Sequence, residues 1–217
     1  LQTYAEEQGL FYPVDFASAG SSQIGGNIST NAGGIKVIRY GMTRDWVAGL
    51  TVVTGKGDIV RLNKDLLKNN TGYDMRHLFI GGEGTLGFVT EATMRLARPP
   101  KNLTVLVLGV PEMAAIMNVL HKFQSGIDLT AFEFFSDKAL NKVLARGDVQ
   151  APFETETEFY ALLEFEAETD DKMDVAMQLF EACMEEGWVF DGVISQNETQ
   201  AANLWRLRED ISETISH

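Results

Sequence analysis

Cysteine is nearly absent from this sequence: Cys183 is the single one among 217 residues. One cysteine excludes an internal disulfide and is typical of a protein in a reducing compartment. Cys183 lies among apolar residues at helical spacing. We therefore expect a buried structural thiol at this position rather than a redox-active one.

Positive charge is also scarce. The chain has 18 Lys and Arg residues against 31 Asp and Glu residues, which gives a net charge of −13 at pH 7. Nucleic-acid binding needs a basic footprint, so the composition argues against a nucleic-acid partner. An anionic substrate would have to be held by locally placed Arg or Lys against the overall negative field.

Metal-ligand spacing is missing as well. The three histidines, His77, His121 and His217, have no ligand spacing among them. The acidic clusters at 154–158 and 168–174 are typical of solvated loops and of first helical turns. We expect no metal site in this chain.

Long apolar runs are absent too. No uninterrupted run approaches the roughly 18 residues of a membrane span, so we expect no transmembrane segment. No basic and apolar targeting segment stands at Leu1, but the sequence does not begin with Met, so this absence says little about targeting. The expected location is the cytoplasm, or the mitochondrial matrix in a eukaryote, with peripheral membrane association left open.

Glycine, by contrast, is concentrated in one segment, Pro13–Gly34. It contains five glycines, four serines and two asparagines, with almost no charge. Glycine is unfavourable in helices and weakens strands, so the composition predicts a loop rather than a regular helix. Glycine also lets a backbone approach a ligand closely, and such loops suit acceptor-rich groups such as phosphates and flavin edges. A structural loop packed against a sheet is the alternative.

Two further segments are candidates for chemistry. Gly81–Val89 is rich in glycine and precedes a predicted strand, so it is no Rossmann-type GxGxxG turn, and we expect no nicotinamide. Its alternative interpretation is a turn with a solvated Glu83. Arg208 and Ser212 are four residues apart on a predicted helix and should share a face, where the planar guanidinium suits a carboxylate. The alternative is a surface arginine that pairs with Glu209, Asp210 or Glu213.

Together these segments resemble a known family. Gly20–Gly34, Asn70–Asp74 with Phe79–Thr90, and Leu204–Ser212 resemble the FAD-linked D-2-hydroxy acid dehydrogenases, flavoproteins of the vanillyl-alcohol-oxidase type. The resemblance implies a parent enzyme that oxidises a D-2-hydroxy acid to a 2-oxo acid by hydride transfer to flavin N5. An electron-transfer flavoprotein or a quinone would accept the electrons. Another flavin oxidase or reductase acting on an alcohol or sugar, or a non-catalytic binding module, stays open.

The resemblance also implies the site residues. Arg208 would bind the substrate carboxylate, and Ser212 stands where the family has a hydroxyl-bearing residue. No His or Cys lies in Pro13–Gly34, so the FAD is expected to be noncovalent. The FAD-binding residues implied are Pro13, Asp15, Gly20, Ser21, Ser22, Ile24, Gly25, Gly26, Asn27, Thr30, Asn31, Ala32, Gly33, Glu83, Gly84, Gly87 and Val89.

The expected fold class is α+β. Arg98–Lys101, with two consecutive prolines, is the best candidate boundary. The resemblance assigns 1–98 to the C-terminal, second lobe of a PCMH-type FAD-binding domain. It assigns 99–217 to the incomplete start of an FAD-linked oxidase C-terminal (substrate cap) domain. The general base, a second substrate lysine and a divalent-metal motif would then belong to other parts of a longer parent, so no catalytic residue is expected here.

The periodicity predicts the elements within these two parts. A hairpin is expected over 46–62, at most a short helix over 65–69 and a strand over 88–96. After the boundary, four strands alternate with helices, which predicts a ferredoxin-like antiparallel sheet with its helices on one face. A last helix capped by Asn197 is expected to reach the C-terminus.

Overall fold

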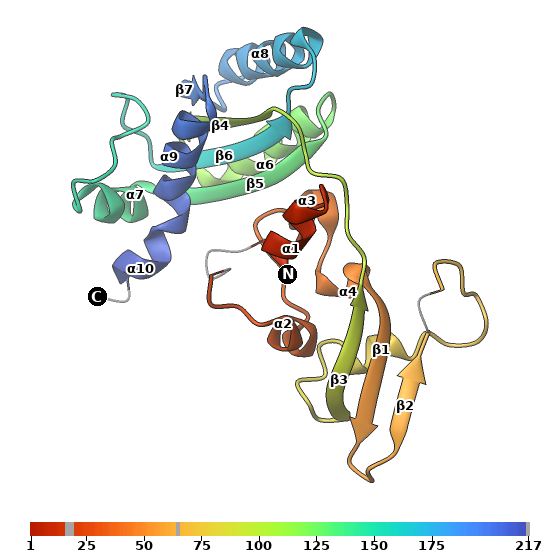
Figure 1. Ribbon diagram of the computed structural model, residues 1–217. Helices are drawn as coiled ribbons and strands as arrows, with labels where there is room; N and C mark the ends of the chain where they lie inside the picture. Colours follow the sequence, from red (N-terminus) through yellow and green to blue (C-terminus); the bar gives the residue numbers. More distant parts are fainter. Residues whose placement is uncertain (16–19, 64–65, 216–217) are drawn as a thin grey trace. The chain divides into compact units, whose positions relative to one another are not determined.

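The computed structural model describes residues 1–15, 20–63 and 66–215 (Figure 1). The chain divides into two compact units, Leu1–Pro99 and Pro100–His217. Part of the glycine-rich segment (16–19), the start of the short helix expected over 65–69, and His217 lie outside the described residues. Each unit is described by itself below.

The first unit is a three-stranded antiparallel sheet with short helices. The strand order is β2-β1-β3. The expected hairpin is confirmed, and the backbone N–H of Thr54 donates to the carbonyl of Asp58 across its turn at 2.9 Å. The elements are α1 (Gln2–Glu7), α2 (Ile24–Thr30), α3 (Val37–Tyr40), α4 (Thr43–Trp46), β1 (Val47–Thr54), β2 (Ile59–Leu62), α5 (Arg76–Phe79) and β3 (Gly87–Met94).

The expectation that Pro13–Gly34 contains no regular helix is wrong, because Ile24–Thr30 form α2. The side chain of Ile28 is only 1% exposed and packs with Val47, Leu50 and other residues of the sheet core. Burial of this apolar position outweighs the poor helix propensity of the two glycines. The helix ends at Asn31, which adopts the left-handed conformation (φ 49°) typical of a helix C-terminus.

At most a short helix was expected over 65–69, and the described part of this segment forms none. Residues 66–69 are irregular. The side-chain amide of Asn63 instead donates to the carbonyls of Ala48 (2.6 Å) and Leu66 (2.9 Å). These bonds give the segment a local alternative to helical hydrogen bonds.

The second unit has a four-stranded antiparallel sheet in the order β5-β6-β4-β7. In chain order this is 2-3-1-4, so the predicted ferredoxin-like α+β arrangement is confirmed. The elements are β4 (Leu103–Val110), α6 (Met113–Gln124), β5 (Leu129–Ser136), α7 (Asp137–Leu144), β6 (Phe159–Glu166), α8 (Asp170–Glu185), β7 (Asp191–Ile194), α9 (Glu198–Glu209) and α10 (Ile211–Ile215).

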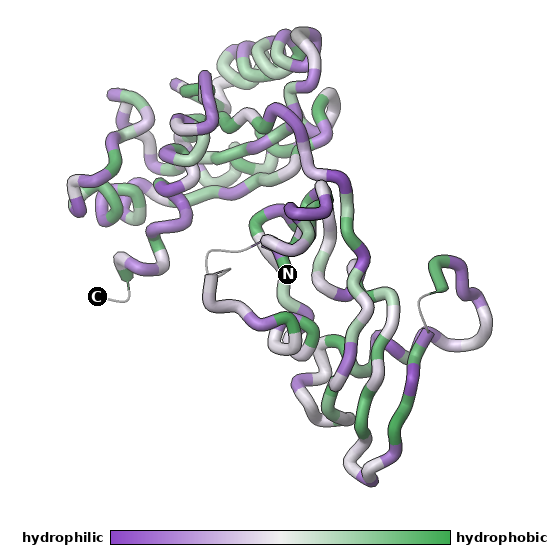
Figure 2. The backbone as a smooth tube through the Cα atoms, viewed as in Figure 1, coloured by the Kyte–Doolittle hydropathy of each residue, from purple (hydrophilic) through white to green (hydrophobic). Residues whose placement is uncertain are grey.

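Helices cover both faces of this sheet, not the one face that was expected (Figure 1). Leu106 and Leu163 lie on the face that packs against α6 and α8. Val105 and Val107, on the opposite face, are fully buried as well, because α9 crosses β4 and β5 there. Burial on both faces explains why β4 and β6 are nearly continuous apolar runs (Figure 2).

The last predicted helix is divided in two. The side chain of Asn197 accepts a hydrogen bond from the backbone of Gln200 at 2.9 Å and caps α9 as predicted. However, α9 ends at Glu209, and a separate helix, α10, begins at Ile211.

None of the helices formed by the described residues is long and apolar enough to cross a membrane.

Candidate functional site

The two glycine-rich segments of the first unit lie against each other. The backbone N–H of Gly81 donates to the carbonyl of Ile28 at 3.0 Å, and that of Glu83 donates to Ser29 at 2.9 Å. The second segment is therefore held along the C-terminal half of α2. Glu83 is exposed and has a positive φ (49°).

The C-terminal end of α2 is fixed from the other side by α4. The side-chain oxygen of Asn31 accepts from the backbone N–H of Arg44 at 2.9 Å. The carbonyl of Ala32 accepts from the hydroxyl of Thr43 at 2.7 Å. At the other end of the helix, the amide of Asn27 donates to the hydroxyl of Ser22 at 3.0 Å. Polar side chains of this segment thus hold the backbone in place.

Some glycines of this region are required by packing. A side chain at Gly34 would lie 1.9 Å from the carbonyl oxygen of Asp15, and one at Gly87 would lie 2.7 Å from Val52. Gly84 has a positive φ (77°), which favours glycine for a conformational reason.

Neither packing nor a positive φ explains the glycines at positions Gly20, Gly25 and Gly26. A side chain added at any of them would meet no atom of the described residues within 4 Å, and none of the three has a positive φ. In a helix each glycine costs up to about 1 kcal/mol relative to alanine. These positions leave bare backbone facing open space, which fits the close approach of a flat, acceptor-rich cofactor such as FAD.

The remaining predicted cofactor residues differ in exposure. Pro13 is buried, and Val89 packs partly buried against the sheet core, so Val89 can offer a ligand mainly its backbone. The hydroxyl of Thr30 donates back to the carbonyl of Gly26 at 3.0 Å. The exposed or half-exposed members of the set are Asp15, Ser21, Ser22, Ile24, Asn27, Thr30, Asn31, Ala32, Gly33 and Glu83.

In the second unit, Arg208 is paired with a residue that the sequence did not indicate. Its Nε–H donates to Oε2 of Glu133 on β5 at 2.8 Å. Two of the neighbours that local sequence offered are bound elsewhere: Asp210 by Arg206 at 3.0 Å, and Glu213 by Arg146 at 3.1 Å.

The single helix predicted to carry Arg208 and Ser212 is divided into α9 and α10, and the shared face of the two residues stays a prediction. Asp210, a poor helix former, stands at the junction as the C-cap of α9, and its carboxylate is drawn towards Arg206. Arg208 is in the last turn of α9 and Ser212 is in the first turn of α10.

A second glutamate joins the sheet to α9. Glu164 is 3% exposed and accepts from the indole N–H of Trp205 at 2.9 Å and from the hydroxyl of Thr130 at 2.8 Å. Sequence reasoning missed both Glu133 and Glu164. The available signal was a lone carboxylate inside an apolar strand, which has to find buried partners.

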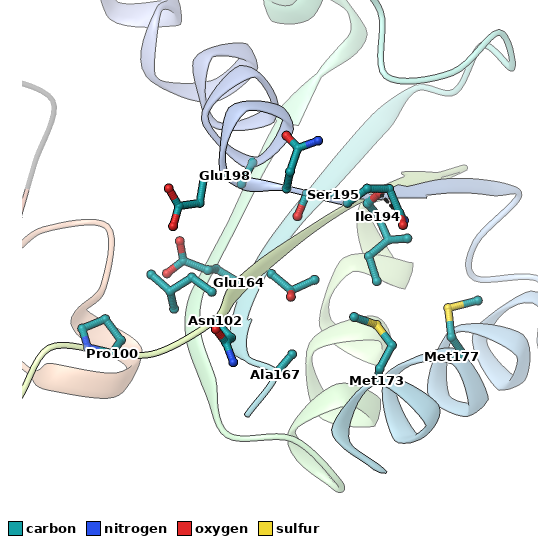
Figure 3. Close-up of a pocket in the computed structure, with 14 residues that line it drawn as sticks. Pro100, Asn102, Glu164, Ala167, Met173, Met177, Ile194, Ser195 and Glu198 are labelled. Carbon is teal, nitrogen blue, oxygen red and sulfur yellow. Dashed lines mark hydrogen bonds between the residues drawn. The ribbon is translucent and has the colours of Figure 1, made fainter. Parts of the chain in front are cut away.

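A cavity of about 700 Å³ lies beside Glu164 in the second unit (Figure 3). Met173 and Met177 of α8, Ser195 and Glu198 line it together with Glu164. No Lys or Arg is among its lining residues in the described part of the chain. Two carboxylates and no cation make it a poor site for an anionic substrate.

Cys183 is buried as expected, and burial raises the pKa of its thiol to about 11. Within residues 1–15, 20–63 and 66–215, no group of three His, Cys, Asp or Glu side chains is placed to hold a metal ion.

Comparison with known families gives matches to both units. Residues 1–63 match the family described as FAD binding domain, and residues 99–217 match the family described as FAD linked oxidases, C-terminal domain.

Curated relatives extend over the whole chain. It is 73% identical over 217 residues to D-2-hydroxyglutarate dehydrogenase of Stutzerimonas stutzeri and 57% identical over 212 residues to the Xanthomonas citri protein of that name. The mitochondrial D-2-hydroxyglutarate dehydrogenase of Arabidopsis thaliana is 37% identical over 99% of the chain. The chain spans 47%, 45% and 39% of these three relatives, so it corresponds to less than half of each.

Solved structures share the fold at low sequence identity. An alkyldihydroxyacetonephosphate synthase matches 99% of the chain with a TM-score of 0.69 and 20% identity, and the chain covers 40% of that structure. A p-cresol methylhydroxylase matches 95% with a TM-score of 0.64 and 14% identity, and the chain covers 45% of it. These likenesses concern the fold alone.

Proposed function

Because this chain belongs to the family of FAD-linked oxidases, we propose that the protein containing it is an FAD-dependent D-2-hydroxy acid dehydrogenase. Its substrate would be D-2-hydroxyglutarate, and its product the corresponding 2-oxo acid. The observation that carries the proposal is the 73% identity, over the whole chain, to a relative with that activity in its name. The specific substrate comes from the relatives, because the residues alone pointed to the broader class of D-2-hydroxy acids.

The first unit would supply part of the FAD site. Gly20, Gly25 and Gly26 leave backbone open to the cofactor. The turn around Glu83 and Gly84 lies against α2, the helix that contains Gly25 and Gly26. Backbone N–H groups held in such turns offer fixed donors to the oxygens of a flavin or a pyrophosphate. When bound, FAD supplies the hydride acceptor. With no His or Cys in Pro13–Gly34, the proposal includes noncovalent attachment.

The second unit would hold the substrate. The guanidinium of Arg208 would bind the carboxylate next to the reacting α-carbon, and the hydroxyl of Ser212 would add a donor. A planar fork gives a carboxylate a fixed orientation, which a lone lysine ammonium does not. Positioning of this kind contributes to rate by holding the reacting carbon in one geometry.

A substrate panel with an artificial dye as electron acceptor tests the proposal. We expect D-2-hydroxyglutarate to reduce the dye, and the L enantiomer and a neutral alcohol analogue to fail. Arg208→Ala in the intact protein should raise KM or lower kcat/KM by at least about tenfold, the size of one lost charge-assisted interaction. An unchanged KM and an unchanged kcat would refute the role given to Arg208, and equal turnover of the neutral alcohol would refute the substrate class.

The natural electron acceptor and the location belong to the same proposal. An electron-transfer flavoprotein or a quinone would reoxidise the flavin. Relatives from Arabidopsis thaliana and Bos taurus are named as mitochondrial. For this chain we propose the cytoplasm, or the matrix if the source is eukaryotic, where reducing conditions fit its single cysteine.

A further inference from the structure

The geometry points to Glu133 as a positioning residue for the substrate-binding arginine, and this inference rests on the function proposed above. Glu133 lies on β5, 75 residues before Arg208 in the sequence. We propose that its carboxylate holds the Nε side of the Arg208 guanidinium, so that the two terminal nitrogens remain available to the substrate carboxylate.

The first support is the shape of the guanidinium group. It has five N–H donors in one plane, one of them on Nε and four on the two terminal nitrogens. Nε donates to Oε2 of Glu133 at 2.8 Å. Among the residues that the structure describes, Glu133 is the one hydrogen-bond partner of the Arg208 side chain. The outer edge of the fork therefore keeps the geometry that a carboxylate accepts in a two-bond arrangement.

The second support is the exposure of the pair. The side chain of Arg208 is 31% exposed and that of Glu133 is 21% exposed. A dissolved acid can reach a half-buried guanidinium. Partial burial also makes the ion pair stronger and less mobile than one in open water.

The third support is the set of hydrogen bonds that joins α9 to the sheet. Glu133 lies opposite Leu162, and Glu164 lies opposite Ala131, so both glutamates project from the same face. Glu164 binds Trp205 and Glu133 binds Arg208, two positions three residues apart on one side of α9. Two carboxylates thus fix the rotation of the helix about its axis, and with it the direction of the arginine.

The charge of Glu133 and its hydrogen bond to Arg208 have opposite effects on substrate binding, and this makes the proposal testable. Its negative charge lies beside the place where a negative substrate would bind, so charge alone disfavours binding. If Glu133 acts by orientation, a neutral acceptor of the same shape should serve as well. Glutamine can accept from Nε–H through its Oε1 and carries no charge.

The test is steady-state kinetics on the intact flavoprotein with D-2-hydroxyglutarate. Glu133→Ala should raise KM about tenfold while kcat changes by less than about threefold, because it frees the arginine without touching the flavin. Glu133→Gln should keep KM within about twofold of the unaltered protein, because the acceptor is retained. Thermal unfolding and FAD content, measured on the same samples, separate a loss of fold from a loss of binding.

Asp148→Ala is the matched control. Asp148 pairs with Arg206, the neighbouring arginine on α9, and is exposed. Removing it eliminates an ion pair made by another arginine of α9, one that has no role in the proposed substrate binding, so we expect KM to change by less than about twofold. If Glu133→Ala does not fold, Glu133→Asp takes its place and should raise KM, because its carboxylate is one methylene too short.

The outcomes distinguish this inference from the function it rests on. If Arg208→Ala raises KM but Glu133→Ala or Glu133→Asp does not, the positioning role is overturned and the proposed function stands. A KM that rises as much in Glu133→Gln as in Glu133→Ala would also overturn it. If Arg208→Ala itself leaves KM unchanged, the substrate role of the arginine fails, and the role of Glu133 fails with it.

Discussion

Gly25 and Gly26 lie in the first turn of a helix that alanine would favour. Neither glycine is required by backbone conformation or by contacts with the part of the chain that the structure describes. Glycine makes this helix less stable than alanine would. Such a loss of stability is expected where the backbone has to stay uncovered so that a ligand can approach it. A substitution here should therefore change stability and cofactor binding in opposite directions, which a purely structural segment would not do.

Gly26→Ala should therefore stabilise the protein without cofactor and weaken cofactor binding. The added methyl meets no described atom within 4 Å and favours the helix, so the apo-protein should gain up to about 1 kcal/mol of unfolding free energy. FAD affinity should fall by about tenfold or more, because the methyl occupies space that the ligand needs. Thermal unfolding of the apo-protein and FAD titration followed by fluorescence measure the two effects.

Ser29→Ala serves as the control on the same helix. It changes helix propensity slightly but lies outside the proposed FAD-binding set, so FAD affinity should stay the same. Gains in stability with unaltered FAD affinity in Gly26→Ala would place the cofactor away from α2.

Cys183 should be inert in the native protein. Its thiol is buried, and its pKa is raised to about 11, so the reactive thiolate is scarce at pH 8. We expect iodoacetamide to leave it unmodified at pH 8 and to alkylate it once the protein is unfolded in urea. Mass spectrometry of both samples measures this, and full labelling of the native protein at pH 8 would contradict the buried position.

Local sequence could predict that Arg208 matters but not what holds it. The residue type and the neighbouring Trp205 and Ser212 carried the resemblance. The partner, Glu133, comes from a strand 75 residues earlier, so only the folded sheet brings the two side chains together. For the same reason Glu164 and Trp205 did not appear as a pair from spacing alone.

The hydrogen bonds of Glu164 hold α9 against the sheet and should contribute to the stability of the second unit. Its indole at Trp205 and the hydroxyl of Thr130 both donate to the buried Glu164. Glu164→Ala would leave both donors without their acceptor. We expect the free energy of unfolding to fall by about 2–4 kcal/mol in denaturant titrations.

Glu166→Ala is the comparison on the same strand. Its carboxylate accepts a 3.3 Å bond from the exposed backbone of Lys101, so its removal should change stability by less than about 1 kcal/mol. Equal effects of the two substitutions would mean that the Glu164 network contributes little to holding α9.

Arg76 links α5 to the start of β1, and Asp74 holds it there. Arg76 donates to the carbonyls of Val47 and Ala48 at 2.7 Å each, and its guanidinium is bound to Asp74 at 2.6 Å. The hydrogen bond from Arg76 lowers the pKa of Asp74 below its usual value. A lowered native pKa stabilises the fold above the unfolded pKa of about 4 and loses that effect as the pH falls through the native pKa.

Asp74→Asn should accordingly destabilise the protein at pH 7 and have less effect at acidic pH. Asp74 is 44% exposed, so solvent screening limits the loss at pH 7 to about 1 kcal/mol or less. Urea titrations at pH 7 and pH 3 measure the difference between the two proteins. A difference that stays constant, or grows towards pH 3, would contradict the ion pair.

Periodicity predicted the strands well and the glycine-rich helix badly. Alternating or continuous apolar residues in β1, β4 and β6 have the same cause in sequence and structure, namely burial on one or both faces. Helix α2 is held by the burial of Ile28 under a sheet whose residues come later in the chain, so local propensity gave the opposite answer. The covering of the second sheet face by α9 was missed because helical spacing does not say which face a helix meets.

The two units together carry the family's fold. The match to FAD linked oxidases over residues 99–217 and to the FAD binding domain over residues 1–63 confirms the resemblance seen in the three segments. The assignment of 1–98 and 99–217 to a lobe and an incomplete cap stays a prediction, as do the individual FAD and substrate contacts. Under the proposed function, the first unit would contribute part of a flavin site and the second unit an arginine that binds the substrate carboxylate.

The most direct measurement is anaerobic reduction of the bound flavin in the intact protein. We predict a yellow protein whose visible absorption bands bleach when D-2-hydroxyglutarate is added without oxygen, and whose flavin is released on acid precipitation. Flavin bands that persist with D-2-hydroxyglutarate but bleach with dithionite would contradict the proposed hydride transfer. A flavin that stays attached to the precipitated polypeptide would contradict noncovalent binding.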